Sequence, residues 1–215
     1  MVIGLVVAMM EEAIPIIEEF KMEGNGEGVF QGRANGNSII LMISGIGKVN
    51  AQNTAWKLIS LGTDRIMNIG TCGDLADKGI GALVLPNIFF DGDFDLSMMD
   101  NTTKDPANVN GRYIATADSR MPAIKEVCYT YSTFITDKRA KGAIVDMEAY
   151  AVASACETVG TKFIAVKCTS DGADDEASET FDVNVSSVIK KHIKEIRSFI
   201  ENYDETYDKI YKLEE

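Results

Sequence analysis

Apolar runs rich in β-branched residues alternate along this chain with segments in which apolar residues recur at helical spacing. The first run, Val2–Ala8, is apolar throughout, as is typical of a strand buried on both faces of a sheet. Glu11–Phe20 follows it with one apolar face, which predicts a helix packed against that sheet. Alternation of this kind predicts an α/β domain with helices on both faces of the sheet.

The later segments continue the alternation. Strands are expected at Ser38–Ser44, Arg65–Ile69, Ala82–Phe90, Tyr129–Thr136, Ala143–Met147 and Phe163–Cys168. Helices are expected at Lys48–Leu61, Ser119–Val127, Glu148–Thr158 and from about Asn184 to Tyr211. The glycine-rich, hairpin-like stretch Gly24–Asn37 and the strand at Ala82–Phe90 favour a mixed sheet, and the polar stretch Asp91–Val109 is expected to be a surface excursion. With 215 residues and no linker-like tract, the chain is predicted to form one domain over 1–215, ending in a helix and charged tail from about residue 184.

The chain is strongly acidic, with 21 basic and 33 acidic side chains and a formal net charge of −12. A surface of this sign repels phosphate backbones and anionic lipids, so neither nucleic acid nor a membrane is an expected partner. Its apolar runs fall short of the ~20 residues of a membrane span, and no basic segment precedes the first of them. The cytoplasm is therefore the predicted location.

The chain has one histidine, His192, in a charged helical run that is expected to be solvated. A single imidazole excludes zinc sites built from several histidines within one chain, and any Ser-His-Asp machinery would depend on this residue. The four cysteines form no C-x-x-C pair and are expected to be buried free thiols: Cys72, Cys128, Cys156 and Cys168. No metal or organic cofactor is predicted, and acid–base chemistry falls to carboxylates.

Carboxylates stand where three predicted strands end. Glu11 and Glu12 follow the first strand, Glu148 follows Ala143–Met147, and Asp171 follows Phe163–Cys168. Ligands of open α/β sheets bind beyond the carboxyl ends of the strands, so these acids are candidates for one pocket. The alternative for each is a helix N-terminal charge that the helix dipole stabilises by ~0.3–1 kcal/mol.

Five short motifs occur in order around these acids: Ala8-Met9-Met10-Glu11-Glu12, Ser44-Gly45-Ile46-Gly47-Lys48-Val49, Asn68-Ile69-Gly70-Thr71-Cys72-Gly73, Val145-Asp146-Met147-Glu148-Ala149 and Thr169-Ser170-Asp171. Together they resemble the nucleoside phosphorylase/nucleosidase superfamily, and within it the 5′-methylthioadenosine/S-adenosylhomocysteine nucleosidase branch. The resemblance runs from Met1 to about Asp182 and is weakest between Asp91 and Arg139. It implies a three-layer α/β/α sandwich around a mixed, twisted sheet. It also implies hydrolysis of the N-glycosidic bond of an adenine nucleoside in methionine salvage, with release of adenine.

The resemblance implies a role for each acid. The transition state of such a cleavage resembles an oxocarbenium ion, and the purine must be protonated as it leaves. Glu12 matches the base that activates water, and Asp171 matches the acid at purine N7, with Ser170 helping to place it. An acid of this kind needs a raised pKa, which burial supplies. Glu148 matches the group that grips the ribose hydroxyls, with Met147 packed against the sugar.

Further residues match the lining of the family's pocket. Met9 and Ile46 are expected to line it, although plain core packing is the alternative for both. The amides of Thr71, Cys72 and Gly73 are expected to face the water, although a tight turn would also explain this stretch.

The segment Phe134-Ile135 is the best match to the aromatic and aliphatic pair that holds the purine. It lies 14 residues before Glu148, a shorter spacing than the family leads one to expect. Ordinary core packing is the alternative for Phe134.

Two other functions stay open. Phosphorylases of the superfamily hold phosphate with arginines, and one of these usually stands where this chain has Asn68. Glu11 and Glu12 in the first loop would repel phosphate, so water is the favoured nucleophile. A phosphate-dependent purine nucleoside phosphorylase and a non-catalytic nucleoside-binding relative are the alternatives. A small-molecule nucleoside and other copies of the chain, with a homodimer favoured, are the partners that the resemblance implies.

Overall fold

The computed structural model describes residues 1–94, 112–113, 126–138 and 144–211, the middle pair by its backbone alone. Its strands are β1 (Val2–Val7), β2 (Glu23–Gly24), β3 (Val29–Ala34), β4 (Asn37–Ile43), β5 (Arg65–Asp74), β6 (Leu83–Val84), β7 (Ile88–Asp91), β8 (Arg112–Tyr113), β9 (Val127–Thr130), β10 (Ile144–Asp146) and β11 (Lys162–Asp171). Its helices are α1 (Met10–Phe20), α2 (Lys48–Ser60), α3 (Ala149–Val159), α4 (Ala177–Lys191), α5 (Ile193–Glu201) and α6 (Tyr203–Tyr211).

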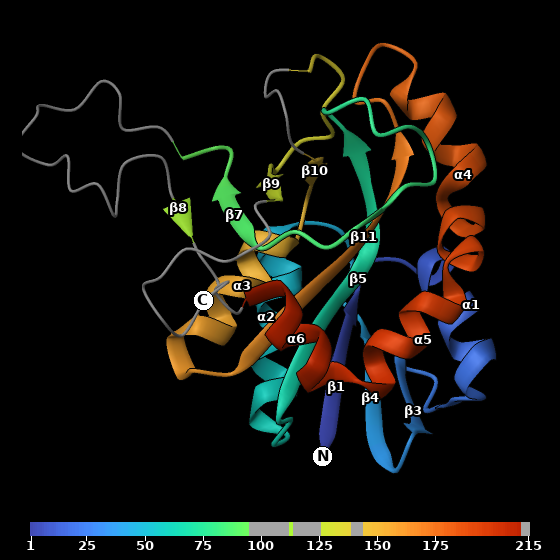
Figure 1. The fold of residues 1–215 in the computed structure, drawn as a ribbon, viewed down its shortest axis with the longest axis vertical. Coiled ribbons are helices and arrows are strands. Elements are labelled where there is room, and N and C mark those ends of the chain that lie inside the picture. The colour runs from blue at the N-terminus through green and yellow to red at the C-terminus, as the bar shows by residue number, and fades with distance from the viewer. Residues whose placement is uncertain (95–111, 114–125, 139–143, 212–215) are drawn as a thin grey trace, which may run out of the picture.

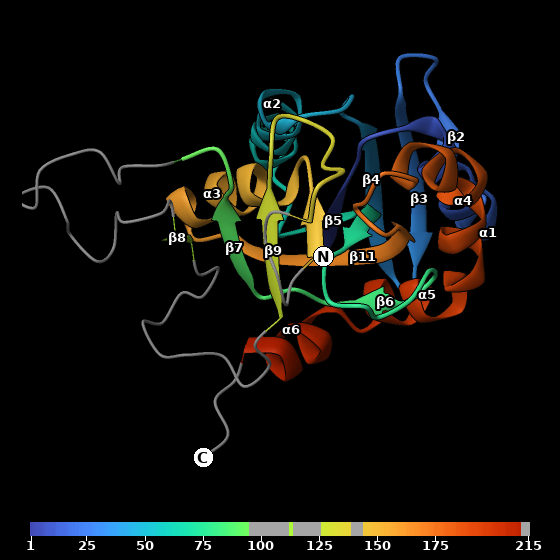
Figure 2. The same cartoon turned by 90° about the horizontal axis from the view of Figure 1, so that it is seen from above.

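The strands form one mixed sheet in the order β2-β3-β4-β1-β5-β10-β9-β7-β8, while β11 pairs with β5 and β6 pairs with β11. β1 runs parallel to β4 and β5, and β11 runs parallel to β5, whereas β10 meets β5 antiparallel. α2 and α3 cover one face, and α1, α4, α5 and α6 cover the other (Figures 1 and 2). The predicted mixed α/β/α sandwich is thus confirmed.

β5 and β11 lie side by side at the centre of the molecule (Figure 1). Both are buried on both faces along almost their whole length. Both also extend beyond the predicted strands, so that Thr71, Cys72, Gly73 and Asp171 belong to strands rather than to the loops after them.

Three predicted elements are corrected. Ala82–Phe90 is two short strands, because Pro86 has no N–H to donate to a ladder; β6 pairs with β11, while β7 pairs with β9. The strand predicted at Tyr129–Thr136 ends at Thr130. The long C-terminal helix is three helices, since the chain bends at His192 and again at Asn202.

Two predictions fall largely outside the described residues. These are the helix at Ser119–Val127, of which Val127 itself lies in β9, and most of the excursion at Asp91–Val109. The charged tail beyond Tyr211 also lies outside them.

His192 is not on a solvated face as predicted. Its side chain is 15% exposed, and its Nε2 lies 2.8 Å from the carbonyl oxygen of Gly81. The imidazole is largely buried because the chain turns here from α4 into α5, and this turn packs against the loop that carries Gly81. The four cysteine thiols are buried. Within the described residues, no helix has the length and apolar character that crossing a bilayer requires.

Candidate active site

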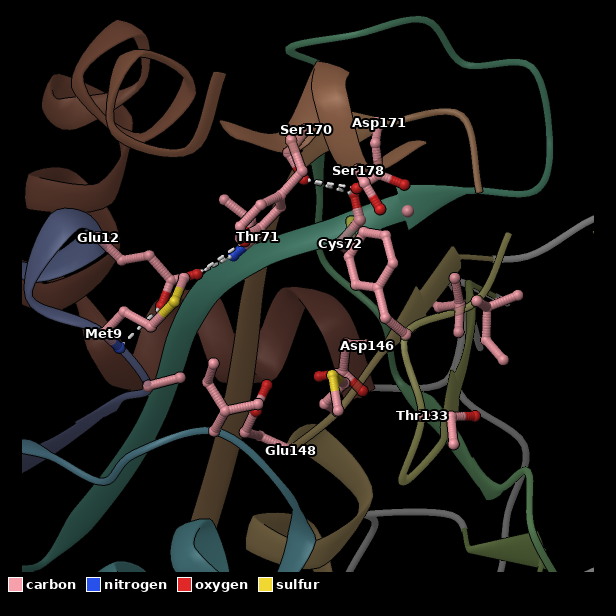
Figure 3. A pocket seen from close by; sticks show the side chains of 18 of the residues that line it. Met9, Glu12, Thr71, Cys72, Thr133, Asp146, Glu148, Ser170, Asp171 and Ser178 are labelled. Atoms are coloured by element: carbon pink, nitrogen blue, oxygen red, sulfur yellow. Dashed lines mark hydrogen bonds between the residues drawn. The ribbon is translucent and has the colours of Figure 1, made fainter. Parts of the chain in front are cut away.

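A cavity of about 360 Å³ lies against the carboxyl-terminal halves of β5 and β11 (Figure 3). The start of α1, the loops after β4 and β9, the turn from β10 into α3, and the first turns of α4 complete its wall. It brings together all twelve residues that the sequence pointed to: Met9, Glu12, Ile46, Thr71, Cys72, Gly73, Phe134, Ile135, Met147, Glu148, Ser170 and Asp171.

Glu12 is fixed at the beginning of α1, directly after β1. Its side chain is buried, and its Oε1 accepts hydrogen bonds of 2.7 Å from both the amide and the hydroxyl of Thr71 (Figure 3). Burial raises the pKa of this carboxyl, while the Thr71 donors and the nearby ammonium of Lys167 lower it. A side chain on Gly70 would come within 3.1 Å of Glu12 Oε1, so the carboxylate lies directly on the backbone of β5.

Asp171 ends β11 on another side of the cavity. Its Oδ1 accepts a 2.9 Å hydrogen bond from the amide of Ala173, and its Oδ2 lies 2.8 Å from the hydroxyl of Ser170. Burial raises the pKa of the Asp171 carboxyl, and the hydrogen bonds from Ala173 and Ser170 offset this only in part. Burial thus shifts this carboxyl toward its protonated form, which is the form that can give a proton to a ligand.

Glu148 stands at the N-terminus of α3. Its Oε1 accepts a 2.8 Å hydrogen bond from the amide of Gly47, whose φ of 102° suits a residue without a side chain. Burial raises the pKa of the Glu148 carboxyl to about 7; Asp146 and Glu12 add to the rise, while Lys167 opposes it.

A buried ion pair below these carboxylates was missed by the sequence reasoning. Lys167 Nζ lies 2.7 Å from Asp146 Oδ2, and both side chains are at most 1% exposed. Burial opposes the charge of Lys167, but Asp146 and Glu148 outweigh it and raise the pKa of the ammonium. The same ammonium lies near Gly70, beside Glu12. The position of Lys167 in the middle of the apolar strand β11 could have indicated this ion pair, since lysine is almost never fully buried without a partner.

Other lining residues were also missed: Ala8, Thr133, Val145, Asp146, Ser178, Phe181 and Asp182. Phe181 meets Phe134 edge to face, with ring centroids 5.6 Å apart. Phe134 is 41% exposed, so it is not a core residue, whereas Ile135 is buried against Leu75 and Ala173. Nothing in the sequence separated the first turns of α4 from an ordinary amphipathic helix.

The cavity thus presents three carboxyls, each of which accepts hydrogen bonds from the protein: Glu12, Glu148 and Asp171. Among the described residues, no group of histidine, cysteine, aspartate and glutamate has the arrangement of a metal site. Such a set of carboxyls suits acid–base cleavage of a bond to a good oxygen- or nitrogen-linked leaving group.

The fold is that of nucleoside phosphorylase-like proteins. The solved structure of futalosine hydrolase from Helicobacter pylori superposes with a TM-score of 0.78 at 23% identity, covering 93% of this chain and 97% of that one. A model of the phosphorylase superfamily matches residues 2–201, and the chain belongs to this superfamily.

Curated relatives of this chain carry nucleosidase names. A 5′-methylthioadenosine/S-adenosylhomocysteine nucleosidase of Marinomonas sp. strain MWYL1 is 28% identical over 209 residues, covering 84% of this chain and 90% of that protein. An aminodeoxyfutalosine nucleosidase of Helicobacter pylori is 27% identical over 227 residues, covering 93% of this chain and 97% of that protein.

Proposed function

We propose that this protein hydrolyses the N-glycosidic bond of an adenine nucleoside, with 5′-methylthioadenosine and S-adenosylhomocysteine as substrates and adenine as product. The observation that carries the proposal is the convergence of Glu12, Glu148 and Asp171 on one cavity. The names of the relatives supply the substrate class.

In this mechanism Glu12 orients a water molecule below C1′ and removes its proton as the oxygen attacks. The C1′–N9 bond breaks, its electron pair moves into the purine, and Asp171 delivers a proton to N7. Glu148 accepts hydrogen bonds from the ribose hydroxyls, and Met147 packs against the sugar. Phe134 and Ile135 contact the purine, while Met9 and Ile46 border the 5′ group. The amides of Thr71–Gly73 border the water.

Hydrolysis rather than phosphorolysis follows from the charges around the cavity. No lysine or arginine is among its described lining residues, whereas five carboxyls are: Glu12, Asp146, Glu148, Asp171 and Asp182. Asn68, at the position where the phosphorylases hold an arginine, is buried and donates to the carbonyl of Val6. A phosphate dianion would meet repulsion from these carboxyls, because the nearby ammonium of Lys167 is already paired with Asp146.

The direct test is product analysis with and without phosphate. We expect methylthioadenosine to give adenine and free methylthioribose in phosphate-free buffer, at a rate that added phosphate does not increase. Chromatography of both products measures this. Strict dependence on phosphate, with a sugar 1-phosphate as product, would establish the phosphorylase alternative, and tight binding without any release would establish the non-catalytic one. Aminodeoxyfutalosine belongs in the substrate panel because a relative is named for it.

The pH dependence should follow Glu148. With its pKa at about 7, the unliganded carboxyl gains a proton as the pH falls below 7 and loses acceptor strength for the ribose hydroxyls. We expect kcat/KM to fall by about tenfold per pH unit below pH 7, and Glu148→Gln to remove the part of this limb that Glu148 causes, leaving the part due to protonation of Glu12.

The free energy of unfolding should change with pH in the opposite direction to kcat/KM, falling as the pH rises. The folded Glu148 holds its proton more tightly than the unfolded chain, whose carboxyl titrates near 4.5. Between these two values the folded state binds more protons, so its stability falls as the pH rises. Urea unfolding should show that Glu148→Gln gains on the order of 2–3 kcal/mol relative to the wild type between pH 5 and 8. An equal difference at both pH values would contradict the assignment.

We further propose that the protein acts as a cytoplasmic homodimer in methionine salvage. Buried free thiols are typical of a reducing compartment. Ile46 and Val49, on either side of Gly47 and Lys48, are 51% and 72% exposed. A second copy of the chain would cover these apolar side chains. Light scattering of the purified protein tests the dimer.

A further inference from the structure

Lys48, the first residue of α2, joins that helix to the turn that follows β7. Its Nζ lies 2.6 Å from Asp91 Oδ1 and 2.7 Å from Asp93 Oδ2, and its side chain is only 18% exposed. Burial lowers the pKa of this ammonium, but the two aspartates outweigh burial and raise it. The pair of aspartates therefore favours the charged form of Lys48.

The turn that Lys48 holds is in turn bonded to the segment after β9. Asp93 Oδ2 accepts a 2.7 Å hydrogen bond from the amide of Ser132, and the amide of Gly92 donates to the carbonyl of Thr130 at 2.8 Å. A side chain on Gly92 would overlap the ring of Tyr131, so the turn lies flat against this segment. The ammonium thus acts on Ser132 through a single intervening carboxylate.

Ser132 begins the cavity rim, which we define as residues 132–135. Thr133, Phe134 and Ile135 of the rim all line the cavity. The far end of the same segment is fixed separately, because the amide of Lys138 donates to the carbonyl of Ala173 at 3.1 Å. At the near end, the amide of Tyr131 donates to the carbonyl of Asp146 at 2.9 Å, and Asp93 holds the next residue, Ser132, where the rim begins.

The residue before Lys48 serves the opposite side of the cavity. Gly47 donates its amide to Glu148, as described above. Two consecutive residues therefore hold the two sides of the cavity: Gly47 holds Glu148, and Lys48 holds the rim through Asp93.

We propose that Lys48 is a positioning residue that sets the rim at a fixed distance from Glu148, so that a nucleoside can meet both at once. This rests on the proposed function, in which the rim contacts the purine and Glu148 contacts the ribose. Lys48 touches neither the substrate nor the reacting atoms, and it acts through Asp91 and Asp93.

Lys48→Met tests the proposal, because it keeps the aliphatic stem and removes the charge. We expect KM for methylthioadenosine to rise by about fivefold or more while kcat stays within about threefold, since the lost interaction serves ground state and transition state alike. The Kd of adenine, measured by calorimetry, should rise in parallel because adenine has no ribose, so it meets the rim and Asp171 but not Glu148. Lys48→Arg keeps the charge on a group of different shape, so both constants should lie between those of the wild type and those of Lys48→Met.

A matched control is Lys78→Met. Lys78 pairs with Glu126 at 3.0 Å with similar exposure, and neither residue lines the cavity, so KM and Kd should not change. Asp93→Asn is a second variant that should weaken binding in the same way. The double variant with Lys48→Met should be no worse than either single change, because both remove the same link.

The proposal is overturned if KM and the Kd of adenine in Lys48→Met both stay within about twofold of the wild type, or if Lys78→Met changes them as much. A wild-type protein that releases no adenine from any nucleoside would refute the proposed function instead. The Kd of adenine needs no turnover, so it decides the role of Lys48 in that case as well.

Discussion

Asp171→Asn is expected to lower kcat for adenine release by about 10²–10⁴, because an amide can donate a hydrogen bond to purine N7 but cannot transfer a proton to it. The change is nearly isosteric, and the amide oxygen still accepts the hydrogen bond from Ala173. Burial already disfavours the charged form of this carboxyl, so its neutral replacement should not lower the free energy of unfolding. The measurement is steady-state kinetics on methylthioadenosine together with urea unfolding of both proteins.

Asp175→Asn is the matched control, since it removes an exposed charge from the same loop. Its kcat should equal that of the wild type. A nucleoside analogue whose base leaves without protonation should be cleaved by Asp171→Asn at close to the wild-type rate. A kcat for methylthioadenosine within about threefold of the wild type would rule out the proposed acid.

Lys167→Met is expected to cost about 3–5 kcal/mol of folding free energy at pH 8, because it leaves the buried carboxylate of Asp146 without its counter-charge. Glu148 and Glu12 lose the same cation, so the pKa of Glu148 should rise above about 7. The loss should shrink at pH 5, where Glu148, with its pKa at about 7, is protonated and no longer needs the ammonium. Urea unfolding at the two pH values measures both effects, and the acid limb of kcat/KM should move to higher pH.

Lys162→Met, on the same strand, is the control for this effect. Lys162 pairs with Asp204 at 2.9 Å, but its side chain is 33% exposed and that of Asp204 is 49% exposed. Exposed pairs contribute about 0–1 kcal/mol, so this change should be mild at both pH values. A loss in Lys167→Met no larger than that in Lys162→Met would show that the buried pair does not hold the cavity together.

Ten of the twelve predicted residues could be found because each belongs to a short motif next to a recognisable strand, whereas Phe134 and Ile135 came from the family resemblance alone, since the strand predicted there ends at Thr130. The convergence of Glu12 and Asp171 follows from one rule, that parallel strands deliver their carboxyl ends to the same edge of a sheet, whereas Glu148 reaches the cavity from β10, which runs antiparallel to β5. Their roles stay predictions until the variants are measured. The exposure of Phe134 decided against core packing, which the sequence had left open.

The partners of these residues could not be predicted in the same way. Lys167 and Asp146 lie 21 positions apart on strands that both pair with β5, so their meeting depends on strand register. The bridge from Lys48 through Asp93 depends equally on how a turn lies on another segment. Helix breaks at His192 and Asn202 carry no proline or glycine, and tertiary packing sets them where periodicity predicted one continuous helix.

The central place of β5 has a consequence for how the protein is made. On the ribosome, Glu12 emerges 159 residues ahead of Asp171, and β5 emerges well before β11, its longest partner. The edge of β5 that pairs with β11 therefore stays open while residues 75–161 are translated. An open apolar edge of this kind invites pairing with other chains, which makes it a place for chaperones to act. The cavity that holds Glu12 and Asp171 is complete only after α4 has been translated, because Ser178, Phe181 and Asp182 of that helix line it.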